Sequence, residues 1–167
     1  SNKLVYIDVK TDKITTTSLD LKEFTTTVYH YPISLLSDGS VIFGFNCKAI
    51  GIYNSGKNEL QKFALDLADA ETYTIEFYIE DKDGNMWIGT NKGIFLVKKK
   101  KKIIKQFNEK TSPSLSNLNC LSAFIDSKDR LWLGTFGGGL NLLERDAKGN
   151  YKNTIIDNKS GLCDDNI

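Results

Sequence analysis

The stretch DKDGNMWIGTNKG, residues 81–93, decides the fold, because the chain repeats it. A related stretch, DSKDRLWLGTFGGG, covers residues 126–139, and Trp87 and Trp132 in the two stretches stand 45 residues apart. A motif that recurs at a fixed offset is the mark of a repeat architecture, in which each copy builds one unit of the same structure. The rest of the chain can therefore be read in steps of 45 residues.

A more divergent copy lies upstream, in LLSDGSVIFGF at residues 35–45. Gly44 holds the place that Gly89 and Gly134 hold in the other two copies, whereas Ile42 stands where they have tryptophan. The chain thus contains a first, a second and a third copy of one pattern. A period of about 40–50 residues is typical of β-propeller blades and of helical arrays.

The residues around each copy favour strands over helices. Short runs rich in Val, Ile, Phe, Tyr, Trp and Thr alternate with Gly and Asp/Asn clusters at hairpin spacing. A turn or two of helix is expected only in SLDLKEF and LQKFALDLADAE, residues 18–24 and 60–71. The strands expected in the second and third copies cover residues 74–80, 85–90, 93–98, 102–107, 121–126, 130–135, 139–144 and 151–157.

Four antiparallel strands per 45 residues form the module of a propeller blade. The sequence therefore predicts an all-β fold: a partial β-propeller of about 3–4 four-stranded antiparallel blades, forming one domain over residues 1–167. Its expected parts are a blade end, three blades and a linker to the next blade, at residues 1–20, 28–66, 73–108, 120–157 and 158–167. Since a closed ring needs about four to eight blades, bare apolar faces and self-association through them are expected.

The segment DKDGNMWIGTNKGIF, residues 81–95, resembles the two-component regulator propeller repeat family. DSKDRLWLGTFGGGLNLL, residues 126–143, is similar to the same pattern with one extra glycine. The resemblance implies a fragment of the extracytoplasmic, periplasmic sensor region of a bacterial hybrid two-component regulator. Many such regions respond to complex carbohydrates. An oligosaccharide ligand and no catalysis by this chain are the expectations that follow.

Composition excludes several other classes. A formal net charge of +1 indicates no basic face for nucleic acid. The sequence also lacks the run of about 18 apolar residues that a membrane contact would need. Cys47, Cys120 and Cys163 lack close C-x-x-C spacing, which favours free thiols and leaves one disulfide as the alternative. His30 is the only histidine, so a histidine-based metal cluster is excluded. We predict no metal and no cofactor.

Recurrence separates structural residues from candidate ligand contacts. Ligand contacts need not repeat around a ring, so the repeated positions are expected in the core between blades, with sugar-stacking tryptophans as the alternative. The expected structural residues are Trp87, Gly89, Trp132, Gly134 and Gly44. The glycines are expected to let the next blade approach closely. Asn, Asp and flat aromatic groups suit sugar hydroxyls and rings, and they also make turns. The candidate ligand-binding residues are Asn46, Asn91, Phe136, Asn117, Asn119, Asp164, Asp165 and Asn166.

Three functional hypotheses remain from the sequence. The first is the non-catalytic sensor, the second is a fragment of a lyase-like propeller enzyme, and the third is a scaffold for protein–protein interaction. A lyase would need a base, for which His30 is the one histidine, and it is expected to pack in a loop. The lysine run at residues 98–102 is expected to be a hairpin that protects a sheet edge. GTFGGGL joins two strands and lacks the Gly-Lys-Ser/Thr ending of a phosphate loop.

Overall fold

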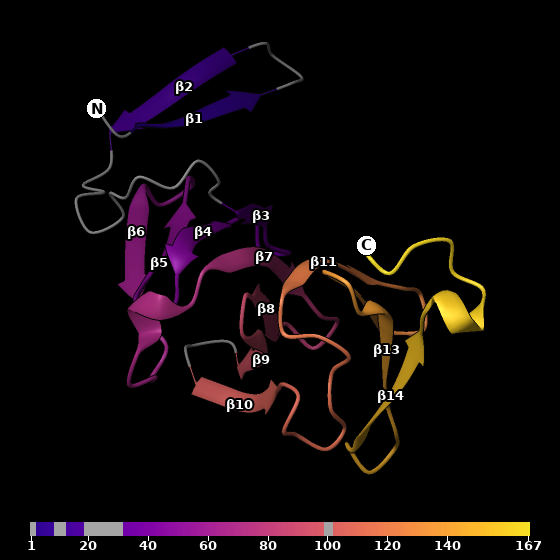
Figure 1. Ribbon diagram of the computed structural model, residues 1–167. Coiled ribbons are helices and arrows are strands. Elements are labelled where there is room, and N and C mark those ends of the chain that lie inside the picture. The colour runs from indigo at the N-terminus through magenta and orange to yellow at the C-terminus, as the bar shows by residue number, and fades with distance from the viewer. Residues whose placement is uncertain (1–2, 9–12, 19–31, 99–101) are drawn as a thin grey trace.

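The computed structural model describes the chain except for residues 1–2, 9–12, 19–31 and 99–101. The described residues form one two-stranded hairpin and three four-stranded sheets, all antiparallel (Figure 1). Helix is limited, among these residues, to the short 3-10 turns η2 (Ala70–Thr72) and η3 (Asn158–Ser160). The prediction of an all-β fold is therefore confirmed.

Each four-stranded sheet pairs its strands in chain order, as a propeller blade does. The first sheet contains β3 (Ile33–Leu35), β4 (Val41–Asn46), β5 (Ala49–Asn54) and β6 (Glu59–Phe63). The second sheet contains β7 (Ile75–Glu80), β8 (Met86–Thr90), β9 (Gly93–Lys98) and β10 (Lys102–Phe107). The third sheet contains β11 (Cys120–Ile125), β12 (Leu131–Thr135), β13 (Gly139–Arg145) and β14 (Tyr151–Ile156). The eight strands expected in the last two sheets agree with these bounds to within one residue at each end.

The hairpin near the N-terminus pairs β1 (Lys3–Asp8) with β2 (Lys13–Ser18). The helix expected in residues 18–24 and the loop around His30 lie outside the described residues. Residues 99–101 of the lysine run also lie outside them, between the end of β9 and the start of β10. The helix expected in residues 60–71 is wrong for most of that span, because β6 pairs with β5 up to Phe63 and only η2 follows.

An aspartate at the end of the first strand shapes the turn into the second strand in the second and third sheets. Asp81 Oδ1 accepts hydrogen bonds from the backbone N–H of Asp83 at 3.0 Å and of Asn85 at 2.8 Å. Gly84 completes this turn at a φ of +74°. In the third sheet Asp126 has the same role, and Asp129 takes the place of Gly84 at a φ of +61°. A carboxylate that caps its own turn explains why the motif begins with aspartate.

Two apolar cores lie between neighbouring sheets. The core between the first and second sheets, here the first interface, contains Ile42, Cys47, Ile50, Leu65, Ala70, Ile75, Tyr78, Ile88, Phe95 and Val97. The core between the second and third sheets, here the second interface, contains Trp87, Ile94, Leu96, Phe107, Leu115, Cys120, Leu131, Leu133 and Leu143. The second sheet thus buries its opposite faces against different neighbours, which is why both Trp87 and Ile88 are apolar.

The two repeated tryptophans have different surroundings. Trp87 is 3% exposed, and its ring lies 5.7 Å from the ring of Phe107 and 5.6 Å from that of Tyr151, centroid to centroid. Trp132 is only half-buried, and its Nε1–H donates to Asp126 Oδ2 at 3.0 Å. The expectation that both tryptophans lie in a core between blades stays a prediction for Trp132. It occupies the outer face of the third sheet, where the described residues place no further sheet.

The repeated glycines also differ from the expectation. A Cβ at Gly89 would overlap the ring of Phe77, which faces it from β7 in the same sheet. A Cβ at Gly134 would lie 2.6 Å from Ser122 Oγ, again in the same sheet, and 2.7 Å from the carbonyl oxygen of Ile167. Only at Gly44 does a neighbouring sheet approach closely, because the Tyr78 hydroxyl of β7 donates to the Gly44 carbonyl at 3.2 Å.

Candidate functional site

The sheets have two ends with different connections. The linker end carries the β4–β5, β8–β9 and β12–β13 loops and the segments that join one sheet to the next. The turn end carries the aspartate turns and the outer hairpins β5–β6, β9–β10 and β13–β14. All eight candidate ligand-binding residues belong to the linker end, in two separate groups.

Asn46 and Asn91 form the first group, on either side of Thr74. Asn46 is 8% exposed, and its Oδ1 accepts from the backbone N–H of Lys48 and Ala49, both at 3.0 Å. The backbone of Asn46 forms an isolated antiparallel β-bridge with Thr74. The Thr74 N–H in turn donates to Asn91 Oδ1 at 3.0 Å. The oxygens of both amides are therefore used to hold loops and linkers together.

The second group gathers around the β12–β13 loop. Asn117 Oδ1 accepts from the backbone N–H of Asn119 at 2.8 Å, and the Asn119 carbonyl accepts from the N–H of Phe136 at 3.0 Å. Phe136 is 58% exposed, so it is a large apolar side chain left open to solvent at this end. The loop is close-packed at Gly138, where a Cβ would meet Asn117 Cβ at 2.8 Å.

The C-terminal residues complete the second group. The Asp165 carbonyl accepts from the Gly139 N–H at 2.8 Å, and its Oδ1 accepts from the Asn158 N–H at 2.7 Å. Asp164 Oδ1 accepts from both the backbone N–H and the amide of Asn166, and these bonds hold the pKa of Asp164 below its ordinary value. Five of the eight predicted residues therefore use side-chain oxygens to hold turns and linkers, and Phe136 is the exposed aromatic residue among the eight.

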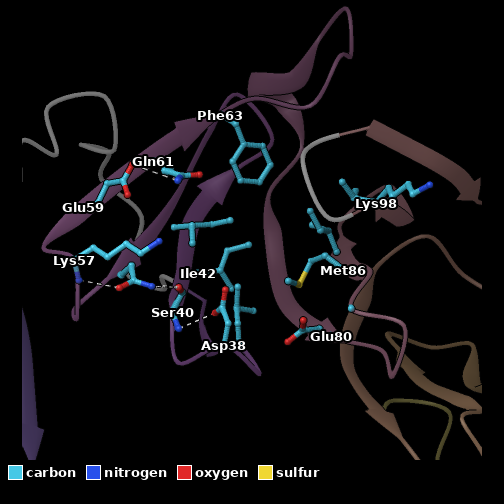
Figure 2. Close-up of a pocket in the computed structure, with 16 residues that line it drawn as sticks. Asp38, Ser40, Ile42, Lys57, Glu59, Gln61, Phe63, Glu80, Met86 and Lys98 are labelled. Carbon is cyan, nitrogen blue, oxygen red and sulfur yellow. Dashed lines mark hydrogen bonds between the residues drawn. The ribbon is translucent and has the colours of Figure 1, made fainter.

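A feature of different character lies at the turn end, between the first and second sheets. It is a cavity of about 310 Å³, here the inter-sheet cavity (Figure 2). Its floor is apolar and comes from both sheets. The floor residues are Leu36, Ile42, Ile52, Phe63, Met86, Ile88 and Val97. Its rim is polar and consists of Asp38, Ser40, Asn54, Lys57, Glu59, Gln61, Glu80 and Lys98, with Gly84 beside it.

Hydrogen bonds within the turns fix much of this rim. Both carboxylate oxygens of Glu80 accept from Ser37, one from the backbone N–H at 2.6 Å and one from the hydroxyl at 3.0 Å. Asn54 donates to Ser40 Oγ at 3.1 Å and accepts from the Lys57 N–H at 3.0 Å. The Glu80 pair ties the first sheet to the second at the mouth of the cavity.

Reasoning from the sequence missed this cavity, since none of the eight predicted residues lines it. One signal was present in the sequence, namely that Ile42 replaces the tryptophan of the other two copies. An isoleucine at this position between two sheets leaves empty the volume that a tryptophan side chain would fill.

Metal and thiol chemistry find little support in the described part of the chain. It contains no group of three or more His, Cys, Asp or Glu side chains placed to hold a metal ion. The three cysteines are free, Cys47 and Cys120 are buried, and burial raises the pKa of each of these two thiols to about 12. Thiolates are the reactive form, so these two groups act as packing residues.

Comparison with known proteins places the repeat in a family. Residues 74–92 match the model of the two component regulator propeller. A search of curated proteins found no match. Among the described residues, no helix is long and apolar enough to cross a bilayer.

Solved structures of other proteins share the fold of this chain, and one of them also shares more of its sequence. The extracellular domain of a hybrid two-component system from B. thetaiotaomicron is 29% identical, with a TM-score of 0.62 over 81% of this chain and 18% of that one. Virginiamycin B lyase from Staphylococcus aureus is 17% identical, with a TM-score of 0.66 over 95% of this chain and 50% of that one. PorZ, a surface component of the type-IX secretion system of Porphyromonas gingivalis, is 18% identical, with a TM-score of 0.65 over 96% of this chain and 25% of that one. The chain thus spans half or less of the length of each.

The three sheets are propeller blades, and the second contains a two-component regulator propeller repeat. The chain is a propeller domain like the extracellular sensor domains of two-component systems.

Proposed function

We propose that this chain is a non-catalytic, ligand-binding part of the periplasmic sensor region of a hybrid two-component signalling protein, and that it senses an oligosaccharide. The observation that carries the proposal is the repeat at residues 74–92 together with 29% identity to the extracellular domain of such a system. Sensor propellers of this repeat family are typically non-catalytic. The chain spans 18% of that relative, so signalling by the whole protein is part of the proposal.

The linker end supports an oligosaccharide in two ways. Phe136 offers an exposed aromatic face, and polar groups at Asn117 and Asn166 lie in the same loop cluster. Flat aromatic faces and amides are the groups that sugar rings and hydroxyls contact. A ligand bound there would transmit a signal only if its affinity differed between two arrangements of the sensor protomers, because equal affinity shifts no equilibrium.

Calorimetric titration with a panel of diverse oligosaccharides tests this proposal. We expect at least one saturable heat of binding, and we expect Phe136→Ala to weaken it while the melting temperature stays unchanged. A matched control is Phe124→Ala, which removes an exposed aromatic ring from the face of the third sheet instead of from its loops. No binding by any member of a broad panel would count against an oligosaccharide ligand.

A lyase is the second candidate, because the fold is shared with virginiamycin B lyase over 95% of this chain. At 17% identity that likeness concerns the fold alone. The solved lyase is a catalytically inactive His→Ala variant, and in this chain only His30 could supply an imidazole base. The test measures turnover of a substrate by two variants, His30→Ala and His30→Gln. Loss of turnover in both variants would favour the lyase, because neither side chain can act as a base. Loss in His30→Ala alone would favour a different role for this residue.

We also propose that a second copy of the chain covers the outer face of the third sheet. Phe124, 64% exposed, and Trp132 occupy on that face the positions that Ile79 and Trp87 occupy on the buried face of the second sheet. The exposed side of the first sheet, with Leu35 at 72%, is the matching surface that a second copy would present. Blade-on-blade packing would then continue across copies as it does within one chain.

A further inference from the structure

We propose that the inter-sheet cavity is a binding site for an uncharged small molecule with an aromatic body and a hydroxyl end. This site lies at the turn end of the sheets, away from the loop cluster around Phe136, and the inference does not depend on an oligosaccharide ligand. Four observations carry it: the difference between the two interfaces, the apolar floor, the volume and the mixed rim.

The two interfaces are built alike but are filled differently. In the second interface the rings of Trp87, Phe107 and Tyr151 pack within 5.2–5.7 Å of one another, and the space beside them is only about 10 Å³. In the first interface Ile42 takes the position of Trp87 and Phe63 that of Phe107. The equivalent space there measures about 310 Å³. The cavity therefore lies where the repeat pattern places an aromatic cluster.

The floor of the cavity is suited to an aromatic ring. Figure 2 shows Ile42, Phe63 and Met86 facing the open space from both sheets. Cavities lined by aliphatic and aromatic side chains stay dry and take up benzene-like molecules, since water finds no partners in them. Met86 adds an unbranched side chain that adapts to the shape of a guest.

The volume and the rim define the rest of the ligand. About 310 Å³ lies at the low end of the range for small-molecule sites, roughly 300–1,000 Å³. The rim places three carboxylates and two ammonium groups around one opening, so it favours neither a cation nor an anion. Ser40, Asn54 and Gln61 offer neutral hydrogen-bonding groups between them. A hydroxyl can bond to such a rim without the cost of burying a charge.

Indole and tryptophol, which is indole with an uncharged hydroxyethyl arm, are the probes for the test. Binding to the whole chain is measured by calorimetry and by the ligand-induced rise in melting temperature. We expect both probes to bind, and tryptophol to bind more tightly because its hydroxyl reaches the rim. The variant Ile42→Trp should weaken tryptophol binding at least about tenfold, since it places an indole in the site as Trp87 does in the next interface. Ile42→Leu keeps the volume and should bind like the wild type.

Two further variants keep the test decisive. Met86→Phe narrows the cavity from the second sheet and gives the answer if Ile42→Trp does not fold. Phe136→Ala alters only the linker end and should leave tryptophol binding unchanged. The proposal is overturned if the wild type binds neither probe, or if folded Ile42→Trp and Met86→Phe bind as the wild type does. Oligosaccharide titrations of Ile42→Trp and Phe136→Ala separate the two proposals. We expect Phe136→Ala to lose sugar binding and Ile42→Trp to keep it.

Discussion

At the scale of single residues, the contribution of a side chain to stability depends less on its position in the repeat than on the residues that pack against it. Trp87 and Trp132 share the motif and the strand position, yet one ring is enclosed by Phe107 and Tyr151 and the other lies on an outer face. Trp132 is held there by its bond to Asp126 and by the guanidinium of Arg130, 5.5 Å from the ring centroid. The same motif residue therefore contributes differently to the stability of this chain.

Truncating the two tryptophans should reveal that difference. Trp87→Ala is expected to lower the free energy of unfolding by about 3–5 kcal/mol, as other large truncations in cores do. Trp132→Ala should cost about 1–2 kcal/mol, because its ring loses only part of an apolar contact and one hydrogen bond. Urea denaturation followed by far-ultraviolet circular dichroism measures both. Equal losses would show that the outer face of the third sheet is as well covered as the second interface.

Asp126 should make stability depend on pH in acid. The Arg130 guanidinium, followed by the Trp132 indole, holds the pKa of the Asp126 carboxyl well below its ordinary value. A group whose pKa is lowered on folding stabilises the protein above its unfolded pKa of about 4, and this contribution is lost as the pH falls toward the folded pKa. Asp126→Asn should therefore lose less stability than the wild type between pH 5 and pH 2.5.

Urea midpoints at pH 7, 5 and 2.5 test this expectation. The variant should be the less stable protein at pH 7, and the gap should narrow in acid. Lys128→Gln, an exposed change in the same turn, serves as the control and should leave the pH profile unchanged. An identical acid dependence in Asp126→Asn and the wild type would contradict the role given to this carboxyl.

At the scale of strands, the repeated glycine serves the sheet in which it lies. Phe77 pairs with Gly89 across β7 and β8 and fills the space that a side chain would need. In the third sheet the same pair is Ser122 and Gly134. The register of the first strand slips at this point in both sheets, between Ile75 and Phe77 and between Cys120 and Ser122. The glycine thus belongs with a bulge and a cross-strand neighbour.

A double-mutant cycle tests that pairing. Gly89→Ala should destabilise the chain by about 1–3 kcal/mol, because the new methyl displaces the Phe77 ring. In the Phe77→Ala background the ring is gone, so the same glycine change should cost little. Unfolding free energies of the two single variants and the double variant give the coupling. Strict additivity would mean that Gly89 is required for another reason.

The strands were predictable from the sequence because their signals are local. Alternating β-branched and aromatic runs, with aspartate turns such as Asp81–Gly84, placed eight strands to within one residue. What lies between sheets was not predictable in the same way. Whether Gly89 faces Phe77 or a neighbouring sheet, and whether Ile42 leaves a cavity, depends on residues far away in the chain. The eight candidate site residues stay a prediction, while the cavity is a finding of the fold.

At the scale of the whole molecule, the outer apolar faces should control association. The wild-type chain is expected to form dimers or larger species at micromolar concentration, measured by light scattering after size-exclusion chromatography. Phe124→Lys should shift it toward the monomer, because a charge would have to be buried in the contact. Ile104→Lys is the matched control, since Ile104 is 50% exposed but lies on the outermost strand of the second sheet. A monodisperse wild-type monomer would contradict blade packing between copies.

The central functional claim is that the propeller binds its ligand without transforming it. The most direct measurement combines calorimetric titration of the chain with an oligosaccharide found to bind and mass spectrometry of that oligosaccharide after long incubation with the chain. We predict saturable binding and recovery of the ligand with its mass unchanged. A cleaved or eliminated product that increases with the amount of chain, and disappears in His30→Ala, would contradict the sensor and establish an enzyme.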